Sequence, residues 1–161
     1  MGEWWMLGVF FAACVATAAS GAIFAPGPWY AGLRKPRWCP PDWLFGPAWA
    51  VLFCMIAVAG WLVWRAAGFG PALIAYAAQL VLNFAWSWLF FGLRRPDLAF
   101  YELCALWACI GLCIALFAPI SATAAWLFAP YLAWVGFAGA LNLALWRLNG
   151  ARPRPAPLTA G

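Results

Sequence analysis

Long apolar stretches, separated by short polar or proline-rich segments, follow one another along most of the chain. A helix that crosses a membrane needs about 20 mostly apolar residues. Five stretches are long enough, at about residues 4–25, 43–64, 71–91, 97–118 and 124–147. The pattern predicts an all-α integral membrane protein, a bundle of five transmembrane helices in one domain of residues 1–149. Residues 150–161 are rich in Pro, Ala and Arg, and we expect a disordered tail.

The segment between the first two predicted helices is longer than the other connections and carries five prolines together with Trp and Tyr. Five prolines should prevent a regular helix there, while Trp and Tyr collect at membrane interfaces. We expect this first loop to cover the mouth of the bundle as a lid or to rest at the interface. Asp42, at its end, is placed to cap the second helix.

The composition supports a membrane protein, because 68% of the residues are hydrophobic and only 8% are charged, against about 25% charged in soluble domains. Five spans put the two termini on opposite sides. One side then holds a single cation, Arg65, and the other holds Arg34, Lys35, Arg37, Arg94, Arg95, Arg147, Arg152 and Arg154. The positive-inside rule predicts an external N-terminus with a cytoplasmic first loop and C-terminus. This topology accounts for the net charge of +5, so we expect lipid and no nucleic acid as partner.

Groups for conventional catalysis are scarce, since the chain has no histidine and only four acidic residues. Five of the six cysteines lie in apolar runs, and none forms a C-x-x-C pair. We therefore predict no metal site and no cofactor, and interpret the cysteines as packing residues. Glu3 stands where a signal peptide would carry a cation, so we expect the first helix to be retained.

One face of the third predicted helix carries Gln79, Asn83, Trp86 and Phe90, at the spacing i, i+4, i+7 and i+11. Amides are costly in contact with lipid, so this face should point into the bundle. Two interpretations stay open: hydrogen bonds between helices, or polar groups that line a cavity.

Aromatic residues also mark the second and fifth helices, with Trp49 and Phe53 on one and a stripe of Tyr131, Trp134, Ala138 and Asn142 on the other. The deep tryptophans Trp49, Trp86 and Trp134 are candidate contacts for a flat ring, or else packing residues.

The first helix has small residues at every fourth position, Gly8, Ala12, Ala16 and Ser20. Small residues let another helix approach closely. We favour packing inside the bundle over a dimer seam.

Several longer motifs resemble the TspO/translocator protein family, the peripheral-type benzodiazepine receptors. They are WYAGLRKPRW at 29–38, GPAW at 46–49, QLVLN at 79–83 and PYLAW at 130–134. The resemblance covers about residues 4–149. It implies five helices around a central cavity that binds porphyrins such as protoporphyrin IX, and isoquinoline-carboxamide or benzodiazepine-type drugs. It also implies homodimers.

The family's pocket carries over to Trp49, Asn83, Phe90, Trp134 and Ala138, with Ala19, Phe45 and Gly46 as further wall. To these we add Trp38, Phe53, Trp86 and Asn142 as candidate ligand contacts. We expect a flat ring to fit between Trp49 and Trp134, with Asn83 orienting it. The loop cations Arg34, Lys35 and Arg37 are placed to meet the propionates of a porphyrin.

Three functions are compatible with these residues. The first is a tetrapyrrole-binding membrane receptor or sensor. The second is an enzyme-like, light- and oxygen-dependent breakdown of porphyrin, for which the resemblance implies Trp49 and Trp134 as participants. The third is a transporter of porphyrin or sterol. Phe53 stands where many members have Tyr, and the stretch 141–147 lacks the Tyr of the animal cholesterol motif, which argues against sterol.

Overall fold

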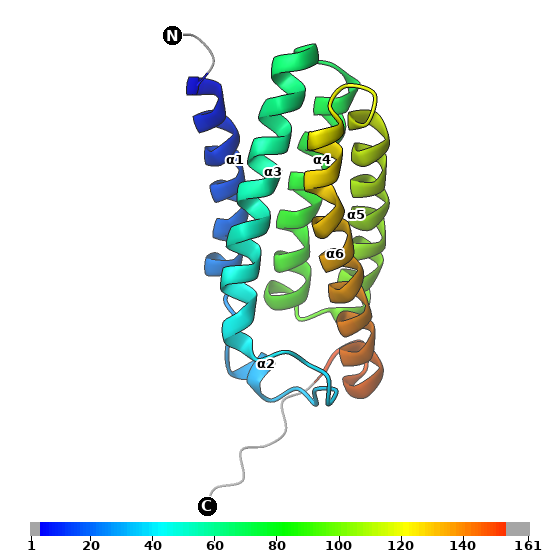
Figure 1. The fold of residues 1–161 in the computed structure, drawn as a ribbon. Helices are drawn as coiled ribbons and strands as arrows, with labels where there is room; N and C mark the ends of the chain where they lie inside the picture. The colour runs from blue at the N-terminus through cyan, green and yellow to red at the C-terminus, as the bar shows by residue number, and fades with distance from the viewer. Residues whose placement is uncertain (1–3, 154–161) are drawn as a thin grey trace, which may run out of the picture.

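Five long helices stand side by side in the computed structural model, which describes residues 4–153 (Figure 1). They are α1 (Trp4–Ile23), α3 (Phe45–Ala67), α4 (Pro71–Ser87), α5 (Pro96–Phe117) and α6 (Ala122–Asn149). Each is long and apolar enough, with the turn that adjoins it, to cross a membrane. The predicted fold class and the number of spans are confirmed: the protein is an integral, multi-pass membrane protein of five helices.

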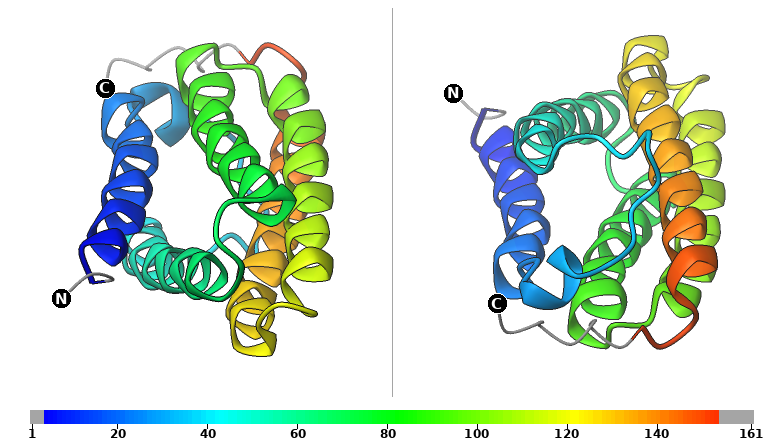
Figure 2. Two further views of the ribbon diagram at one scale, coloured as in Figure 1. Left: turned by 90° about the horizontal axis from the view of Figure 1, so that it is seen from above. Right: turned by 90° about the horizontal axis from the view of Figure 1, so that it is seen from below.

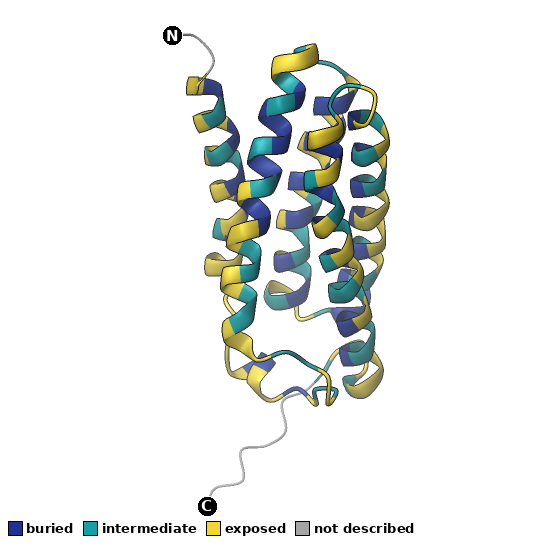
Figure 3. Ribbon diagram, in the orientation of Figure 1, coloured by how far each residue is buried: buried dark blue, intermediate teal, exposed yellow. Residues whose placement is uncertain are grey.

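The helices form a closed ring in the order α1, α3, α6, α5 and α4, with α4 returning to α1 (Figure 2). Most buried residues lie on the faces that point into this ring, and most exposed residues lie on the outer faces (Figure 3). Many of the exposed side chains are large and apolar, for example Val51 at 61% and Ile74 at 71% exposure. Such an outer surface suits lipid and would be unusual in water.

Three short elements complete the fold: α2 (Pro28–Ala31), the 3₁₀-helix η1 (Asp42–Leu44) and the π-helix η2 (Trp88–Gly92). The presence of α2 corrects the expectation that prolines exclude a helix from the first connection. Pro28 occupies the first turn of α2, where its missing N–H costs nothing. Asp42 makes no capping hydrogen bond, so that prediction was also wrong. Its carboxylate instead pairs with Lys35 Nζ at 3.4 Å.

The end of the bundle remote from α2 is tightly packed. Ile56, Ile110, Phe117 and Phe128 are fully buried in its core. Gly60 permits the close approach of α1, α3 and α4, because a Cβ there would lie 2.7 Å from the ring of Tyr76 and 2.8 Å from that of Phe10.

The small-residue stripe of α1 faces the opposite way from our expectation. Gly8, Ala12 and Ala16 are exposed, and a Cβ on Gly8 would meet no atom within 4 Å. Only Ser20 of the stripe is buried, where its hydroxyl donates to Ser87 Oγ at 3.0 Å. The buried face of α1 consists of Met6, Phe10, Cys14, Thr17 and Ser20. Packing inside the bundle was therefore the wrong interpretation of the stripe, and the dimer seam stays a prediction.

The first connection and the end of α6 are fastened together. Asn149 Oδ1 accepts from the Arg34 backbone N–H at 2.8 Å, and Asn149 Nδ2 donates to the Arg34 carbonyl at 2.9 Å. Trp29 Nε1 donates to the carbonyl of Pro153 at 3.2 Å. The connection therefore runs across this end of the bundle (Figure 2). Residues 150–153 form an irregular turn, and the predicted disorder of residues 154–161 lies outside the described residues.

Candidate ligand-binding cavity

A cavity of about 680 Å³ lies between the helices and extends from the first connection toward the middle of the bundle. All five long helices and η2 contribute to its wall, together with Pro26, Tyr30 and Asp42 at its mouth. The wall is mostly apolar and aromatic. The volume of the cavity falls within the range of about 300–1,000 Å³ that is usual for sites of small ligands.

Aromatic rings from α3 and α6 form one corner of the cavity. The ring centroids of Trp49 and Trp134 lie 6.5 Å apart with an interplanar angle of 88°. Phe53 lies beside Trp49 at 5.5 Å, and Phe45 lies beside Trp134 at 6.0 Å. A ring held between two indoles needs parallel faces about 7 Å apart, twice the contact distance of carbon atoms. The expected slot between Trp49 and Trp134 is therefore absent, and the two indoles meet edge to face.

A second aromatic wall comes from the end of α4 and from η2. Trp86 and Phe90 stack with centroids 5.3 Å apart and planes at 21°, and Phe91 contacts Phe90 at 4.9 Å. Short π-helical turns such as η2 are frequent at functional sites. Trp29 and Tyr30 of α2 pack on Phe90 at 5.7 and 6.3 Å, so the first connection is seated on this wall.

Three polar side chains form a network behind the corner. Tyr131 is fully buried; its hydroxyl donates to Gln79 Oε1 at 2.9 Å and accepts from Asn83 Nδ2 at 2.8 Å. Both amides thus face the bundle. The sequence left open whether they make hydrogen bonds between helices or line a cavity, and the answer differs for the two residues. Gln79 serves a bond between helices, whereas Asn83 makes such a bond and also lines the cavity. Oδ1 of Asn83 has no partner among the described residues and stays available to a ligand.

Two further polar groups of the cavity wall differ in how they are paired. The Trp134 indole N–H is buried and lacks a hydrogen-bond partner within residues 4–153. A buried unpaired donor costs about 1–3 kcal/mol, which an acceptor supplied by a ligand would recover. Asn142, in contrast, accepts from Trp86 Nε1 at 3.3 Å and donates to the Pro96 carbonyl at 2.6 Å. Its side chain therefore joins α4, α5 and α6.

Ten of the twelve residues that the sequence put forward as ligand contacts line the cavity. They are Phe45, Gly46, Trp49, Phe53, Asn83, Trp86, Phe90, Trp134, Ala138 and Asn142. Ala19 and Trp38 do not. Ala19 is displaced because its neighbours Ala18 and Ser20 take the cavity face of α1. Trp38 is 51% exposed and packs on Phe137 at 5.9 Å, outside the wall.

The loop cations Arg34, Lys35 and Arg37 also lie outside the lining. Lys35 contacts the wall, since its ammonium pairs with Asp42 at 3.4 Å and lies 4.1 Å from the ring centroid of Tyr30. Asp42 and Tyr30 are themselves part of the wall. Burial raises the pKa of Tyr30, so its hydroxyl stays protonated near neutral pH.

Sequence reasoning named only Ala19 of α1, and no residue of α5, as part of the cavity wall. Phe11, Cys14 and Val15 line the cavity, as do Leu103 and Leu106. Ser20 is the one polar residue of α1 among the lining residues, and Leu103 and Leu106 of α5 are apolar, so the sequence contained little signal for these faces. Val15, Ala18, Ala50 and Cys54 line the cavity and are also exposed. The cavity is therefore not closed off along the seam between α1 and α3.

The ring of five spans and the cavity inside it define a multi-pass membrane protein with an apolar, aromatic internal cavity. The sequence profile of the TspO/MBR family matches residues 10–147, and the chain belongs to that family. It is 37% identical over 156 residues to "Protein CrtK" of Rhodobacter capsulatus, covering 92% of this chain and 96% of the relative. It is 38% identical over 151 residues to the "Tryptophan-rich sensory protein" of Cereibacter sphaeroides, covering 94% and 96%. The human "Translocator protein" is 38% identical over 126 residues, 75% of each chain.

Proposed function

We propose that the protein is a membrane receptor or sensor that binds a tetrapyrrole such as protoporphyrin IX in the central cavity. Membership of the TspO/MBR family supports the role of a membrane sensor or receptor. The observation that carries the choice of ligand is the aromatic wall of the 680 Å³ cavity. Isoquinoline-carboxamide and benzodiazepine-type molecules, which are also flat and apolar, would occupy the same space.

The wall offers a flat ring more than one surface. The ring can stack on one indole of the Trp49–Trp134 corner while the other indole borders its edge. Asn83 Oδ1 can accept a hydrogen bond from a ligand N–H. Charged propionates are costly at membrane depth, so they would lie toward the mouth, where Lys35 can exchange its pairing with Asp42 for a ligand carboxylate.

The test is a titration with protoporphyrin IX that follows quenching of tryptophan fluorescence. The double variant Trp134→Phe with Asn83→Ala removes an indole and an amide from the wall, and we expect weaker binding. The matched control is Trp126→Phe, because Trp126 is 77% exposed and lies outside the cavity. Unchanged affinity in the double variant would contradict the assignment of the pocket.

A second candidate is breakdown of bound porphyrin with light and oxygen. The observation in its favour is the direct contact of the two indoles Trp49 and Trp134 on the cavity wall, since indoles are oxidisable. Illumination of the protein with protoporphyrin should then give a new product that the Trp49→Phe variant forms more slowly. Equal loss of porphyrin without protein would exclude this activity.

A further inference from the structure

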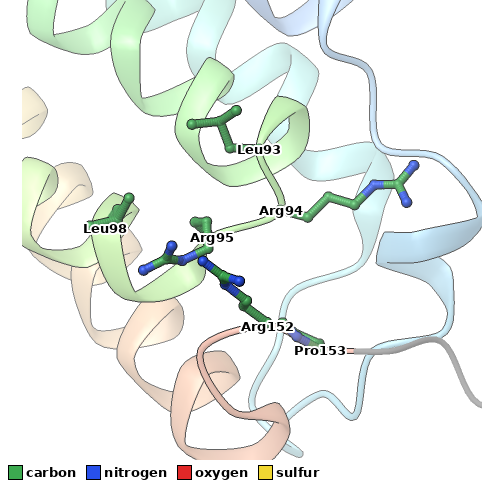
Figure 4. A pocket seen from close by; sticks show the side chains of 6 residues that line it. All are labelled: Leu93, Arg94, Arg95, Leu98, Arg152 and Pro153. Carbon is green, nitrogen blue, oxygen red and sulfur yellow. The ribbon is translucent and has the colours of Figure 1, made fainter.

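A second depression, of about 610 Å³, lies at the bundle end that holds the first connection. It forms where the link between η2 and α5 meets the segment after α6 (Figure 4). The lining residues are Leu93, Arg94, Arg95, Leu98, Arg152 and Pro153. Half of these side chains are arginines, which is unlike the apolar wall of the central cavity.

The positive charge of this depression is only partly neutralised. Arg95 Nε donates to Asp97 Oδ1 at 2.7 Å, and Arg95 Nη2 pairs with Asp97 Oδ2. Within residues 4–153, neither Arg94 nor Arg152 has an acidic partner. Neither of these two guanidinium charges is neutralised by an acidic side chain of the described residues.

The backbone that carries the arginines is held in place. Arg94 adopts a left-handed conformation with φ of 55°, which is uncommon for a residue with a side chain. The turn is closed by the Arg95 N–H, which donates to the Leu89 carbonyl at 3.0 Å. On the other side, Trp29 Nε1 binds the carbonyl of Pro153, next to Arg152.

The arginine side chains differ in direction. Arg95 and Arg152 point into the same space between the start of α5 and the segment after α6, and Arg94 extends the other way (Figure 4). An anion in that space would contact Arg152 and the already paired Arg95, whereas the Arg94 side chain points away from it. Guanidinium groups suit phosphate because their N–H donors form a planar fork.

Two leucines give the depression an apolar side. Leu93 is 46% exposed and Leu98 is 39% exposed. They adjoin the ends of two membrane-spanning helices, α4 with η2 and α5. Inorganic phosphate cannot make apolar contacts with these leucines. A phospholipid can, because it presents an acyl chain together with its phosphate.

We propose that this depression binds the phosphate of an anionic glycerophospholipid, with an acyl chain along Leu93 and Leu98. The site is separate from the central cavity and does not depend on the function proposed for it. General attraction between basic residues and anionic lipids acts on every exposed cation. At a specific site, by contrast, the preference for anionic over zwitterionic lipid should depend on Arg152 far more than on an exposed cation elsewhere at the same end of the bundle.

The experiment uses the full-length protein in nanodiscs of phosphatidylglycerol and phosphatidylcholine. Native mass spectrometry measures the ratio of the two lipids that stay bound. We expect wild type to retain phosphatidylglycerol preferentially and Arg152→Gln to lower this preference about fivefold, the effect of one cation at an anionic headgroup. Arg152→Lys, which keeps the charge and loses the fork, should lie between them.

The matched control is Arg37→Gln, because Arg37 is exposed and lies outside the depression. It should leave the preference nearly unchanged, and so should Arg94→Gln, because the Arg94 side chain points away from the shared space. Arg152→Ala gives a second variant should Arg152→Gln fold poorly. An equal preference in wild type and in the Arg152→Gln and Arg152→Ala variants would overturn the proposal. An equal loss in Arg37→Gln would show diffuse surface charge instead. Complete displacement of phosphatidylglycerol by millimolar inorganic phosphate would assign the site to free phosphate and overturn the lipid assignment.

Discussion

Asn83, which faces the cavity, is held by Tyr131, whose hydroxyl accepts a hydrogen bond from Asn83 Nδ2 at 2.8 Å. The same hydroxyl donates to Gln79 Oε1 at 2.9 Å. One fully buried phenol on α6 thus joins two amides of α4 and fixes the direction in which Asn83 presents its Oδ1. The orientation of the polar group in the cavity depends on a residue behind the wall.

Replacing Tyr131 with Phe should destabilise the bundle, because both amides lose their partner. Hydrogen bonds between membrane helices contribute about 0.6–2 kcal/mol each, so the loss of two should lower the free energy of unfolding by about 1–4 kcal/mol. Unfolding in detergent mixtures, followed by circular dichroism, measures the loss. The control is Tyr101→Phe, since Tyr101 is 63% exposed and has no side-chain hydrogen bond to another described residue. Equal stability of the two variants would show that the network contributes nothing.

Replacing Asn149 with Ala should loosen the first connection over the mouth of the cavity. The variant loses both hydrogen bonds between the Asn149 amide and the Arg34 backbone. Hydrogen exchange at the Arg34 amide should become at least about tenfold faster, which corresponds to about 1.4 kcal/mol. Arg147→Ala is the control, because Arg147 is exposed on the same turn of α6. Unchanged exchange in the Asn149 variant would mean that other contacts hold the connection.

Occupation of the cavity should protect one cysteine from alkylation. Cys54 and Cys104 are both exposed, but only Cys54 lines the cavity. Protoporphyrin IX should therefore slow the reaction of Cys54 with a membrane-permeant maleimide and leave Cys104 unaffected. Mass spectrometry of peptides from timed reactions measures both rates in one sample. Equal protection of the two cysteines would indicate an effect on the membrane rather than binding in the cavity.

The sequence predicted the five spans because the length of an apolar run alone decides whether a helix can cross the bilayer. It also oriented α4 and α6 correctly, since Gln79, Asn83 and Asn142 cannot face lipid without cost. For α1 it failed. Lipid is as apolar as the protein interior, so a helix without amides gives no signal of its inner face, and the exposed row at Gly8 was assigned to packing.

The spacing of residues along the helices also could not predict how the aromatic rings of the cavity wall are oriented. The sequence placed Trp49 and Trp134 on inward faces but not at a right angle, because the angle depends on side-chain rotamers that neighbours such as Phe53 and Phe45 fix. Trp38 was expected at the cavity from its motif. Its exposed position on Phe137 follows from the path of the first connection, which no local periodicity encodes.

The measurement that tests the central claim most directly is the affinity for protoporphyrin IX of a protein whose cavity has been filled. Ala138 lines the cavity, whereas Ala133 on the same helix is exposed and lies outside it. Ala138→Phe puts a ring into the space of the ligand without removing a hydrogen bond, and Ala133→Phe puts the same ring into lipid. Binding that is lost in Ala138→Phe and kept in Ala133→Phe, with both variants folded, is the result we predict. Wild-type affinity in Ala138→Phe would contradict binding in the central cavity.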